Sequence, residues 1–468
     1  MDPTEIGEVF VTVTGGEAGA ASSLAPIISE DDDNNNGNIS NTNTNSSFGS
    51  GNVNNVDDNI VCEILSRLPV NSLMQLKCVS KHCCSMIRKD RYLIDLHHNR
   101  SKAKPRLFIT VPRKIDGYKK TEHDNPFYPI SYFLVTADLL FEDGELSPVV
   151  RSIREMDTPS YRITGPLNGL ICLFDPEKNH SIQVGNLSTG EFTPWIKSTF
   201  ISNLNVEDKD KYRLRISKCD LGFDSATKEH KVICFWNIHH HQVCEVLTVG
   251  DRTWRVIDDV LPAYNFREWY LFGASIYVNG SIYYSPRKLT GEDAESKFIV
   301  AFDVGKEKFR SIRIPDFILD QIPQKFQPPD SLQLLEIDGH PALLIRISRD
   351  IVKLWLFDNE YGSGYRTNTW TEVKIELPFY WEHVDYGNDV YSVRFHSVIG
   401  TDFIILYLYR CLAVGGGYHF AHKVTQYSYN WKKKFFAEIK INGLPSSIPY
   451  HSYASGMSIF TESLSPVQ

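Results

Sequence analysis

Apolar residues between positions 56 and 100 repeat at the spacing of an α-helix. One stripe is formed by Ile60, Val61, Ile64, Leu65 and Leu68. Asp57 or Asp58 can cap the start of this helix, and Pro69 ends it. Three further short helices are predicted, with N-terminal caps at Asn71 or Ser72, at Ser80 and at Asp90. Four short helices are too little for an independent core, so their apolar stripes predict contact with a partner protein.

From residue 101 onward the pattern changes to short alternating segments that are typical of β-strands. A polar turn followed by an aromatic residue that opens the next strand recurs along this region. These aromatic residues are Phe192, Trp254, Phe309, Trp370 and Trp431, separated by 62, 55, 61 and 61 positions. A weaker copy lies at 142–146. Repeats of this length, each about four strands long, are typical of β-propeller blades. A pair of β-sandwiches with accidental spacing is the alternative.

The predicted fold class is therefore α+β, with a small N-terminal α-helical domain and an all-β domain that forms a β-propeller of about six blades. The helical domain covers 56–100 and the β domain 101–462. Residues 1–55 have no core pattern, and 34–55 contain ten Asn among mostly Ser, Thr and Gly. We predict that this acidic, Asn-rich tail is disordered, because it cannot bury enough apolar surface to offset backbone entropy.

The charge distribution limits the classes of binding partner, and the cysteine content indicates the cellular compartment. Residues 1–58 hold ten acidic residues and no Lys or Arg, so the rest of the chain carries 47 acidic and 49 basic residues. Such a neutral body predicts no nucleic-acid binding. The nine scattered cysteines predict reduced thiols in the cytoplasm or nucleus. The apolar stretch Phe403–Ala421 contains Arg410 at its centre, and we interpret it as strand, glycine turn and strand rather than a membrane span.

The motifs of common catalytic and metal sites are missing from the sequence. It contains no nucleophile elbow, no H-E-x-x-H zinc motif and no phosphate-binding loop. The nearest approach to a zinc site is the group Cys219, Cys234, Cys244 and His239–His241, which lacks paired ligand spacing. We therefore predict no enzyme activity, no metal and no cofactor.

The helical region carries a specific resemblance. The run Cys62–Leu73 reads C-E-I-L-S-R-L-P-V-N-S-L and is followed by K-C-V-S-K at Lys77–Lys81. These phrases resemble an F-box as found in plant ubiquitin-ligase receptors. The resemblance implies docking on an SKP-family adaptor protein through Ile64, Leu65, Leu68, Pro69, Leu73, Leu76, Val79 and Ser80. A helix that ends at a proline and leads into a second helix gives a bent apolar wedge, which suits a groove.

The β domain resembles the F-box-associated, kelch-like domain of the same plant family. The matching phrases include Gly165–Leu173, Leu221–Val232 and Ser275–Tyr284. The resemblance implies a substrate receptor of an SCF-type ubiquitin ligase, linked through the adaptor to cullin and RING subunits. Such a subunit binds an unknown target protein for degradation and does no bond chemistry of its own.

Two clusters rich in Tyr, Trp and Arg are candidates for binding that target, because these residues dominate interface energetics. They are Tyr264, Phe266, Arg267, Trp269 and Tyr270, and Phe379, Tyr380, Trp381, His383 and Tyr386. Packing inside the blades is the competing interpretation of both clusters. Three alternative functions stay open: an F-box scaffold outside ubiquitination, an S-locus-type pollen receptor, and a propeller that binds a small ligand.

Overall fold

The structure is a computed structural model of the whole chain. It describes residues 57–114, 130–142, 145–156, 162–174, 181–203, 215–238, 241–257, 275–285, 297–322, 332–348, 351–358, 369–376, 389–414, 417–419, 424–445, 448 and 456–467. The predicted disordered tail at 1–55 lies outside these residues. Residues 56–468 form one unit, in which four helices precede six β-sheets.

The four N-terminal helices are α1 (Asp58–Leu65), α2 (Val70–Val79), α3 (Lys81–Lys89) and α4 (Arg91–Lys102). Three of the predicted caps are confirmed. Asp57 accepts a hydrogen bond from the backbone N–H of Asn59, Ser80 from those of His82 and Cys83, and Asp90 from that of Leu93. The cap predicted at Asn71 or Ser72 is wrong. Pro69 is the N-cap residue in an extended conformation and makes no side-chain cap, and the helix already begins at Val70, so Asn71 and Ser72 lie inside its first turn.

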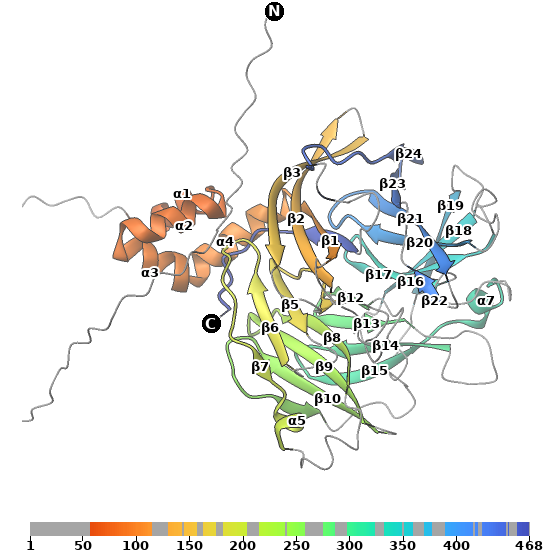
Figure 1. Cartoon of the computed structure of the whole chain (residues 1–468), viewed down its shortest axis with the longest axis horizontal. Helices are drawn as coiled ribbons and strands as arrows, with labels where there is room; N and C mark the ends of the chain where they lie inside the picture. Colours follow the sequence, from red (N-terminus) through yellow and green to blue (C-terminus); the bar gives the residue numbers. More distant parts are fainter. Residues whose placement is uncertain are drawn as a thin grey trace, which may run out of the picture. The chain divides into compact units, whose positions relative to one another are not determined.

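Six antiparallel sheets follow, and Figure 1 shows them arranged around a common centre. One blade contains β4 (Arg162–Ile163), β5 (Leu170–Phe174), β6 (Ser181–Asn186) and β7 (Ile196–Lys197), and the following one contains β8 (Arg215–Asp224), β9 (Glu229–Ile238), β10 (His241–Thr248) and β11 (Arg255–Ile257). The next contain β12 (Ser275–Val278), β13 (Ser281–Tyr284), β14 (Phe298–Asp303) and β15 (Lys308–Arg313), then β16 (Leu332–Ile337), β17 (His340–Arg346), β18 (Ile351–Asp358) and β19 (Thr369–Glu376). A fifth contains β20 (Asp389–Ser397), β21 (Phe403–Val414), β22 (Gly417–His419), β23 (Val424–Asn430) and β24 (Phe435–Glu438). Short helices α5 (Thr199–Asn203) and α7 (Asp316–Leu319) lie between strands.

The sixth blade joins the two ends of the β domain. It contains β1 (Arg106–Lys114), β2 (Ile130–Glu142), β3 (Glu145–Met156) and the C-terminal strand β25 (Gly456–Phe460). Strand β25 pairs with β1 in antiparallel register from Arg106↔Phe460 to Thr110↔Gly456. The inner strands contact one another in the order β8, β12, β16, β20 and β25. This pairing closes the ring and confirms a propeller of six blades.

The turn-plus-aromatic repeat found in the sequence occupies the same position in each blade. Each turn-plus-aromatic unit joins the third strand of a blade to the fourth, as between β6 and β7 or between β18 and β19. The weaker copy at 142–146 is the corresponding turn between β2 and β3. The aromatic residues pack against the hydrophobic cores between and within blades, where Trp254 is fully buried. The repeat therefore counts blades because it marks a turn that every blade needs.

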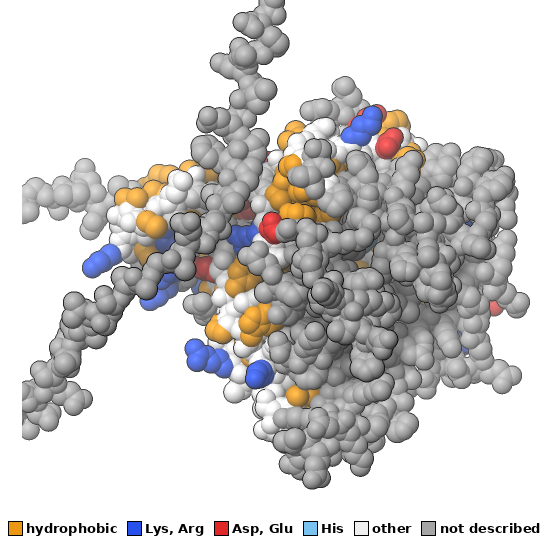
Figure 2. All heavy atoms as spheres, viewed as in Figure 1, with side chains coloured by type: hydrophobic (Ala, Val, Ile, Leu, Met, Phe, Trp, Pro, Cys, Tyr) orange, Lys and Arg blue, Asp and Glu red, His pale blue; other side chains and the backbone are white. Residues whose placement is uncertain are grey.

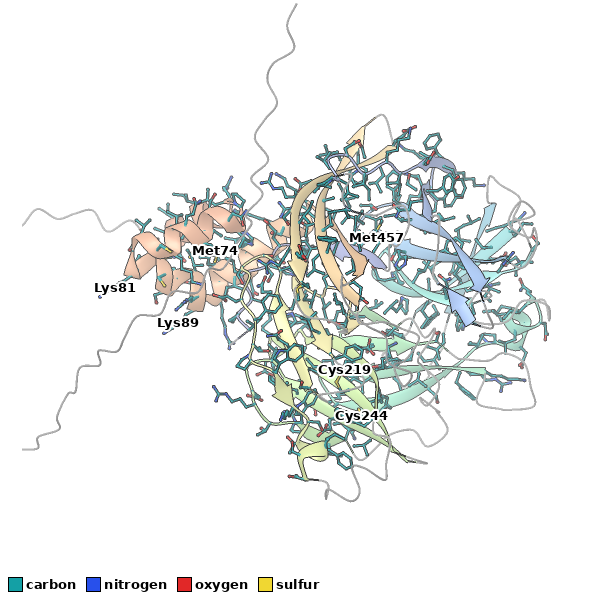
Figure 3. All side chains as sticks on the ribbon, in the orientation of Figure 1. Met74, Lys81, Lys89, Cys219, Cys244 and Met457 are labelled. Carbon is teal, nitrogen blue, oxygen red and sulfur yellow. A yellow bond between two sulfur atoms is a disulfide. The ribbon has the colours of Figure 1, made fainter. Side chains whose placement is uncertain are left out.

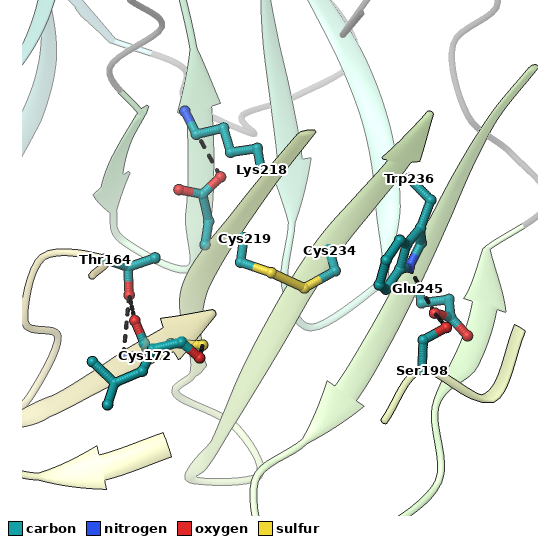
Figure 4. Close-up of a disulfide and its surroundings, with 10 residues drawn as sticks. Thr164, Cys172, Ser198, Lys218, Cys219, Cys234, Trp236 and Glu245 are labelled. Atoms are coloured by element: carbon teal, nitrogen blue, oxygen red, sulfur yellow. Dashed lines mark hydrogen bonds and ion pairs between the residues drawn. A yellow bond between two sulfur atoms is a disulfide. The ribbon is translucent and has the colours of Figure 1, made fainter. Parts of the chain in front are cut away.

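The cysteine prediction is wrong at one position. Cys219 on β8 and Cys234 on β9 form a buried disulfide, with their Cα atoms 4.4 Å apart (Figure 4). They are directly opposite in the register of these strands, at the short spacing of a non-hydrogen-bonded pair. The sequence places them 15 residues apart, and nothing in that spacing reveals the pairing.

The strand, turn and strand predicted for Phe403–Ala421 are confirmed by the pairing of β21 with β22. Among the helices in the described ranges, none has the length and apolar character needed to cross a bilayer.

Candidate functional site

Helices α1 and α2 carry apolar side chains at the surface. Ile60 is 53% exposed and Ile64 is 57% exposed on α1, one turn apart, and Val79 at the end of α2 is 77% exposed. Figure 2 shows hydrophobic atoms at the surface of these helices. The side chains of His82 and Asp58 contact each other at 3.2 Å, which places the α2–α3 turn beside the start of α1. Ile60 and Val79 therefore lie at the same end of the helical domain.

The other predicted adaptor-binding residues divide into buried, exposed and half-buried positions. Leu65 and Leu73 are buried in the core of the helical domain, so they support the surface without forming it. Pro69 is exposed. Half-buried positions are taken by Leu68, Leu76 and Ser80. The apolar stripe of α1 is thus split between a core side and an exposed side.

A charged network fixes α1 against α4. Arg100 donates a hydrogen bond to the backbone oxygen of Glu63 at 2.8 Å and also contacts the Glu63 carboxylate and Ser66. Hydrogen bonding to Arg100 lowers the pKa of Glu63. Nearby, burial and the adjacent Asp90 raise the pKa of the Cys62 thiol to about 11, so that thiol stays protonated and packs as an apolar group. The exposed face of α1 is held rigidly by these contacts.

The helical domain also carries exposed basic side chains. Exposed residues of this kind are Lys81, Arg88, Lys89, Arg91, Lys102 and Lys104. Figure 3 labels Lys81 and Lys89, at the two ends of α3. These side chains suit long-range attraction of an acidic partner.

The helical domain is fixed to the propeller on one side. Lys77 pairs with Glu191 at 2.6 Å, His98 contacts Asn168 at 3.1 Å, and Asp95 pairs with Lys228 at 3.9 Å. Leu464, beyond the last strand, is buried in the helical core. Ile60, Ile64 and Val79 each stay more than half exposed. One face is thus occupied by the protein's own chain and another is free for a partner.

Comparison with known families assigns both domains. A family model described as "F-box associated beta propeller domain" matches residues 142–463, more than half of the chain. A second, "F-box domain", matches residues 54–95. The chain belongs to the plant F-box proteins that carry an F-box associated domain. The helical domain is therefore the F-box, and the match covers the predicted adaptor-binding residues.

Curated relatives from Arabidopsis thaliana are named as F-box proteins. F-box protein At5g65850 is 26% identical over 349 residues, covering 74% of this chain and 76% of the relative. F-box protein At3g47030 is 24% identical over 365 residues, covering 73% and 75%. The similarity thus extends along most of both chains.

The predicted substrate-binding clusters lie outside the described residues. This applies to Tyr264–Tyr270 and to Phe379–Tyr386 alike, so their roles stay predictions. The zinc hypothesis loses two of its thiols to the Cys219–Cys234 disulfide, and Cys244 lies in a different core cluster. Within the described ranges, no group of three or more His, Cys, Asp or Glu side chains could hold a metal ion.

Sequence reasoning missed the C-terminal residues Thr461–Val467. They follow the last strand and include only two strongly apolar residues, Leu464 and Val467. Two apolar residues after a strand give no periodic pattern, so no element is predicted there. Their contacts depend entirely on distant parts of the chain.

Proposed function

We propose that this F-box protein is the substrate-receptor subunit of an SCF-type ubiquitin ligase. The F-box docks on an SKP-family adaptor and through it on cullin and RING subunits. The propeller binds a target protein and holds it near the ubiquitin-charged partner. The receptor does no bond chemistry itself, because its contribution is to convert an encounter in solution into an effectively intramolecular reaction.

The observation that carries the proposal is the exposed apolar side of the F-box. Ile64 and Val79 are more than half exposed on a domain whose core is already filled by Leu65, Leu73 and Leu464. Exposed apolar side chains that are grouped on one small domain favour a protein partner. Burying the two of them fully in an adaptor groove would contribute about 2–4 kcal/mol to binding.

The six-bladed propeller supports the second half of the proposal. Its blades are joined by loops, and binding residues concentrate on loops that a rigid scaffold positions. The aromatic clusters at Tyr264–Tyr270 and Phe379–Tyr386 stay our candidates for contacts with the target protein. The proposed partners place the protein in the cytoplasm or nucleus.

A capture experiment tests adaptor docking. The full chain is compared with the double variant Ile64→Asp and Val79→Asp, using a purified SKP-family adaptor as bait. Ile399→Asp is the matched control, because Ile399 is an isoleucine of similar exposure, 51%, on the propeller. We expect the double variant to lose at least tenfold in adaptor affinity and the control to bind like the parent chain. Equal binding by all three proteins would contradict the proposed interface.

A second measurement separates the ligase receptor from an F-box scaffold outside ubiquitination. The chain is isolated from plant cells, and cullin is measured in the same complex. Proximity labelling with and without a proteasome inhibitor then identifies target proteins. A receptor retains cullin and gains labelled proteins under the inhibitor. If the adaptor co-purifies without cullin, and the inhibitor does not change which proteins are labelled, the result would favour an F-box scaffold outside ubiquitination.

A further inference from the structure

The C-terminal segment Thr461–Val467 contacts both domains. Leu464 is 4% exposed and belongs to the same core cluster as Leu65, Leu73 and Leu93 of the F-box. Three residues later, Val467 is 1% exposed in the core shared by the blades β4–β7 and β8–β11. A segment of seven residues therefore has one apolar side chain in each hydrophobic core.

The backbone of this segment is held by the β4–β7 blade. The side-chain amide of Asn186, at the end of β6, donates to the carbonyl oxygens of Ser463 at 3.0 Å and Ser465 at 2.9 Å. The backbone N–H of Ser463 donates to the hydroxyl of Ser188 at 3.0 Å. Asn186 is fully buried, so these hydrogen bonds are shielded from water.

Charge fixes the start of the segment. Glu462 pairs with Arg106, the first residue of β1, and Arg106 also pairs with Asp138 on β2 at 2.6 Å. Arg106 follows α4 after only three residues. The segment is thus attached beside the point where the F-box leads into the propeller.

The direct polar contacts between the F-box and the blades are weaker restraints. Asp95 and Lys228 are about half exposed and 3.9 Å apart, and such pairs contribute little in water. Lys77 and Glu191 are better buried and closer, but they form a single contact. Leu464 is a large apolar side chain that is almost completely removed from water, and such burial stabilises a contact more than a half-exposed ion pair does. The apolar contacts of the segment therefore dominate the restraint.

We propose that Thr461–Val467 is a strap that fixes the F-box to the β4–β7 blade in one orientation, with Leu464 and Asn186 as its positioning residues. If the chain has the proposed receptor function, the strap also sets the distance and angle between a bound target and the adaptor. This consequence rests on the proposed function. Proximity catalysis depends on that geometry.

Two glycines provide a matched test. Gly169 and Gly280 both have a positive φ, 83° and 82°, so an alanine at either position has the same backbone strain. A Cβ at Gly169 would lie 2.5 Å from the Cβ of Ser463 and 3.1 Å from the carbonyl oxygen of Thr461, whereas one at Gly280 meets nothing within 4 Å. Gly169→Ala therefore displaces the strap, and Gly280→Ala controls for strain alone.

The readout is the distance between the two domains in the full chain. Fluorophores are introduced on unnatural amino acids at two exposed positions, Arg88 on α3 and Lys308 on β15, and single-molecule energy transfer gives the distance distribution. We expect one narrow distribution for the parent chain and for Gly280→Ala. For Gly169→Ala we expect the width to at least double. Leu464→Ala, which removes the apolar contact itself, broadens the distribution in the same way.

Adaptor capture by the same labelled proteins keeps the two proposals apart. Gly169→Ala moves Leu464 but changes neither Ile64 nor Val79, which are exposed and outside the F-box core cluster, so we expect its adaptor affinity to stay within twofold of the parent chain. A Gly169→Ala distribution as narrow as that of Gly280→Ala would overturn the strap, whatever the adaptor result. Absence of adaptor binding in the parent chain would instead overturn the proposed function and leave the distance result standing.

Discussion

Trp236 on β9 donates its indole N–H to the carboxylate of Glu245 on β10, 2.7 Å away. The same carboxylate accepts a hydrogen bond from the hydroxyl of Ser198 at 2.5 Å (Figure 4). It also accepts one from the backbone N–H of Phe200 at 2.9 Å. Glu245 has no exposed surface, and burial raises its pKa. One buried acceptor thus ties the β8–β11 blade to the segment that follows β7.

Glu245→Ala leaves two buried donors, on Ser198 and Trp236, and the half-buried N–H of Phe200 without their acceptor. Each such loss costs about 1–3 kcal/mol, so we expect the variant to unfold at a clearly lower denaturant concentration, with a total cost of at least 3 kcal/mol. Glu245→Gln keeps the size and one acceptor oxygen, and we expect a smaller loss. Urea titration followed by tryptophan fluorescence measures both. A Glu245→Ala midpoint equal to that of the parent chain would show that the donors find other partners.

Acidification is expected to loosen the junction between the F-box and the propeller. Burial lowers the pKa of His98 to about 4 and that of His230 to about 3, and burial also lowers the pKa of His97. A free imidazole titrates near 6.5, so the folded state takes up fewer protons than the unfolded state below that pH. The contribution of these histidines to stability is therefore constant above about pH 6.5 and falls as the pH drops from 6.5 toward 4.

Substitution of one histidine tests this pH dependence. His98 is surrounded by Lys102, Glu462, His97 and the Asn168 amide. His98→Gln retains a polar side chain but no titratable group, so we expect it to lose about 1–2 kcal/mol less free energy of unfolding than the parent chain between pH 7 and pH 5. Its melting temperature should therefore fall less over the same pH range. His82→Gln, an exposed histidine of the same domain, serves as the control. Parallel pH profiles for all three proteins would exclude His98 as a source.

The Cys219–Cys234 bond is expected to survive in the native protein under mild reductant. Both sulfurs are buried, so a thiolate cannot reach them without local unfolding. Cys78 is exposed and is expected to react with iodoacetamide first, whereas burial raises the pKa of Cys172 and Cys244 and protects them. Peptide mapping without reduction checks the bond. Separate Cys219 and Cys234 peptides from freshly purified protein would refute it.

The helices show which features can be predicted from local sequence. The caps at Ser80 and Asp90 were predictable because each needs only its own side chain and the next turn. The start of α2 could not be predicted in this way, because the helix begins directly after Pro69 and does not use Asn71 as its cap. The repeat of turn and aromatic residue was sufficient to give the number of blades, since every blade needs that turn.

Features that depend on distant segments could not be predicted. Leu464 is an isolated leucine in sequence, and only the closure of β25 onto β1 brings it to the F-box. The Cys219–Cys234 bond depends on the register of β8 against β9, which shifts at a bulge between Ile216 and Lys218. The adaptor-binding stripe was predicted as a set, but its division into buried Leu65 and exposed Ile64 requires the packing of α4.

Phe192, the repeated aromatic residue of the β4–β7 blade, packs directly against Gly185. A Cβ at Gly185 on β6 would lie 2.1 Å from the ring of Phe192, so glycine at 185 is what allows the ring to pack there. We expect Gly185→Ala to expel Phe192 and to cost about 1–3 kcal/mol through overpacking. Gly165→Ala is the control, because its Cβ would meet only ordinary contacts at 3.6 Å from Ser458.

A double variant shows whether the clash is the cause. If Phe192 is the only obstacle, then Phe192→Ala abolishes the further cost of Gly185→Ala, and the two substitutions are strongly non-additive in melting temperature. Phe192 also lies under the guanidinium of Arg154, 5.9 Å from the ring centre, so Phe192→Ala alone lowers stability as well. Additive losses would mean that Gly185 is required for a reason other than the ring.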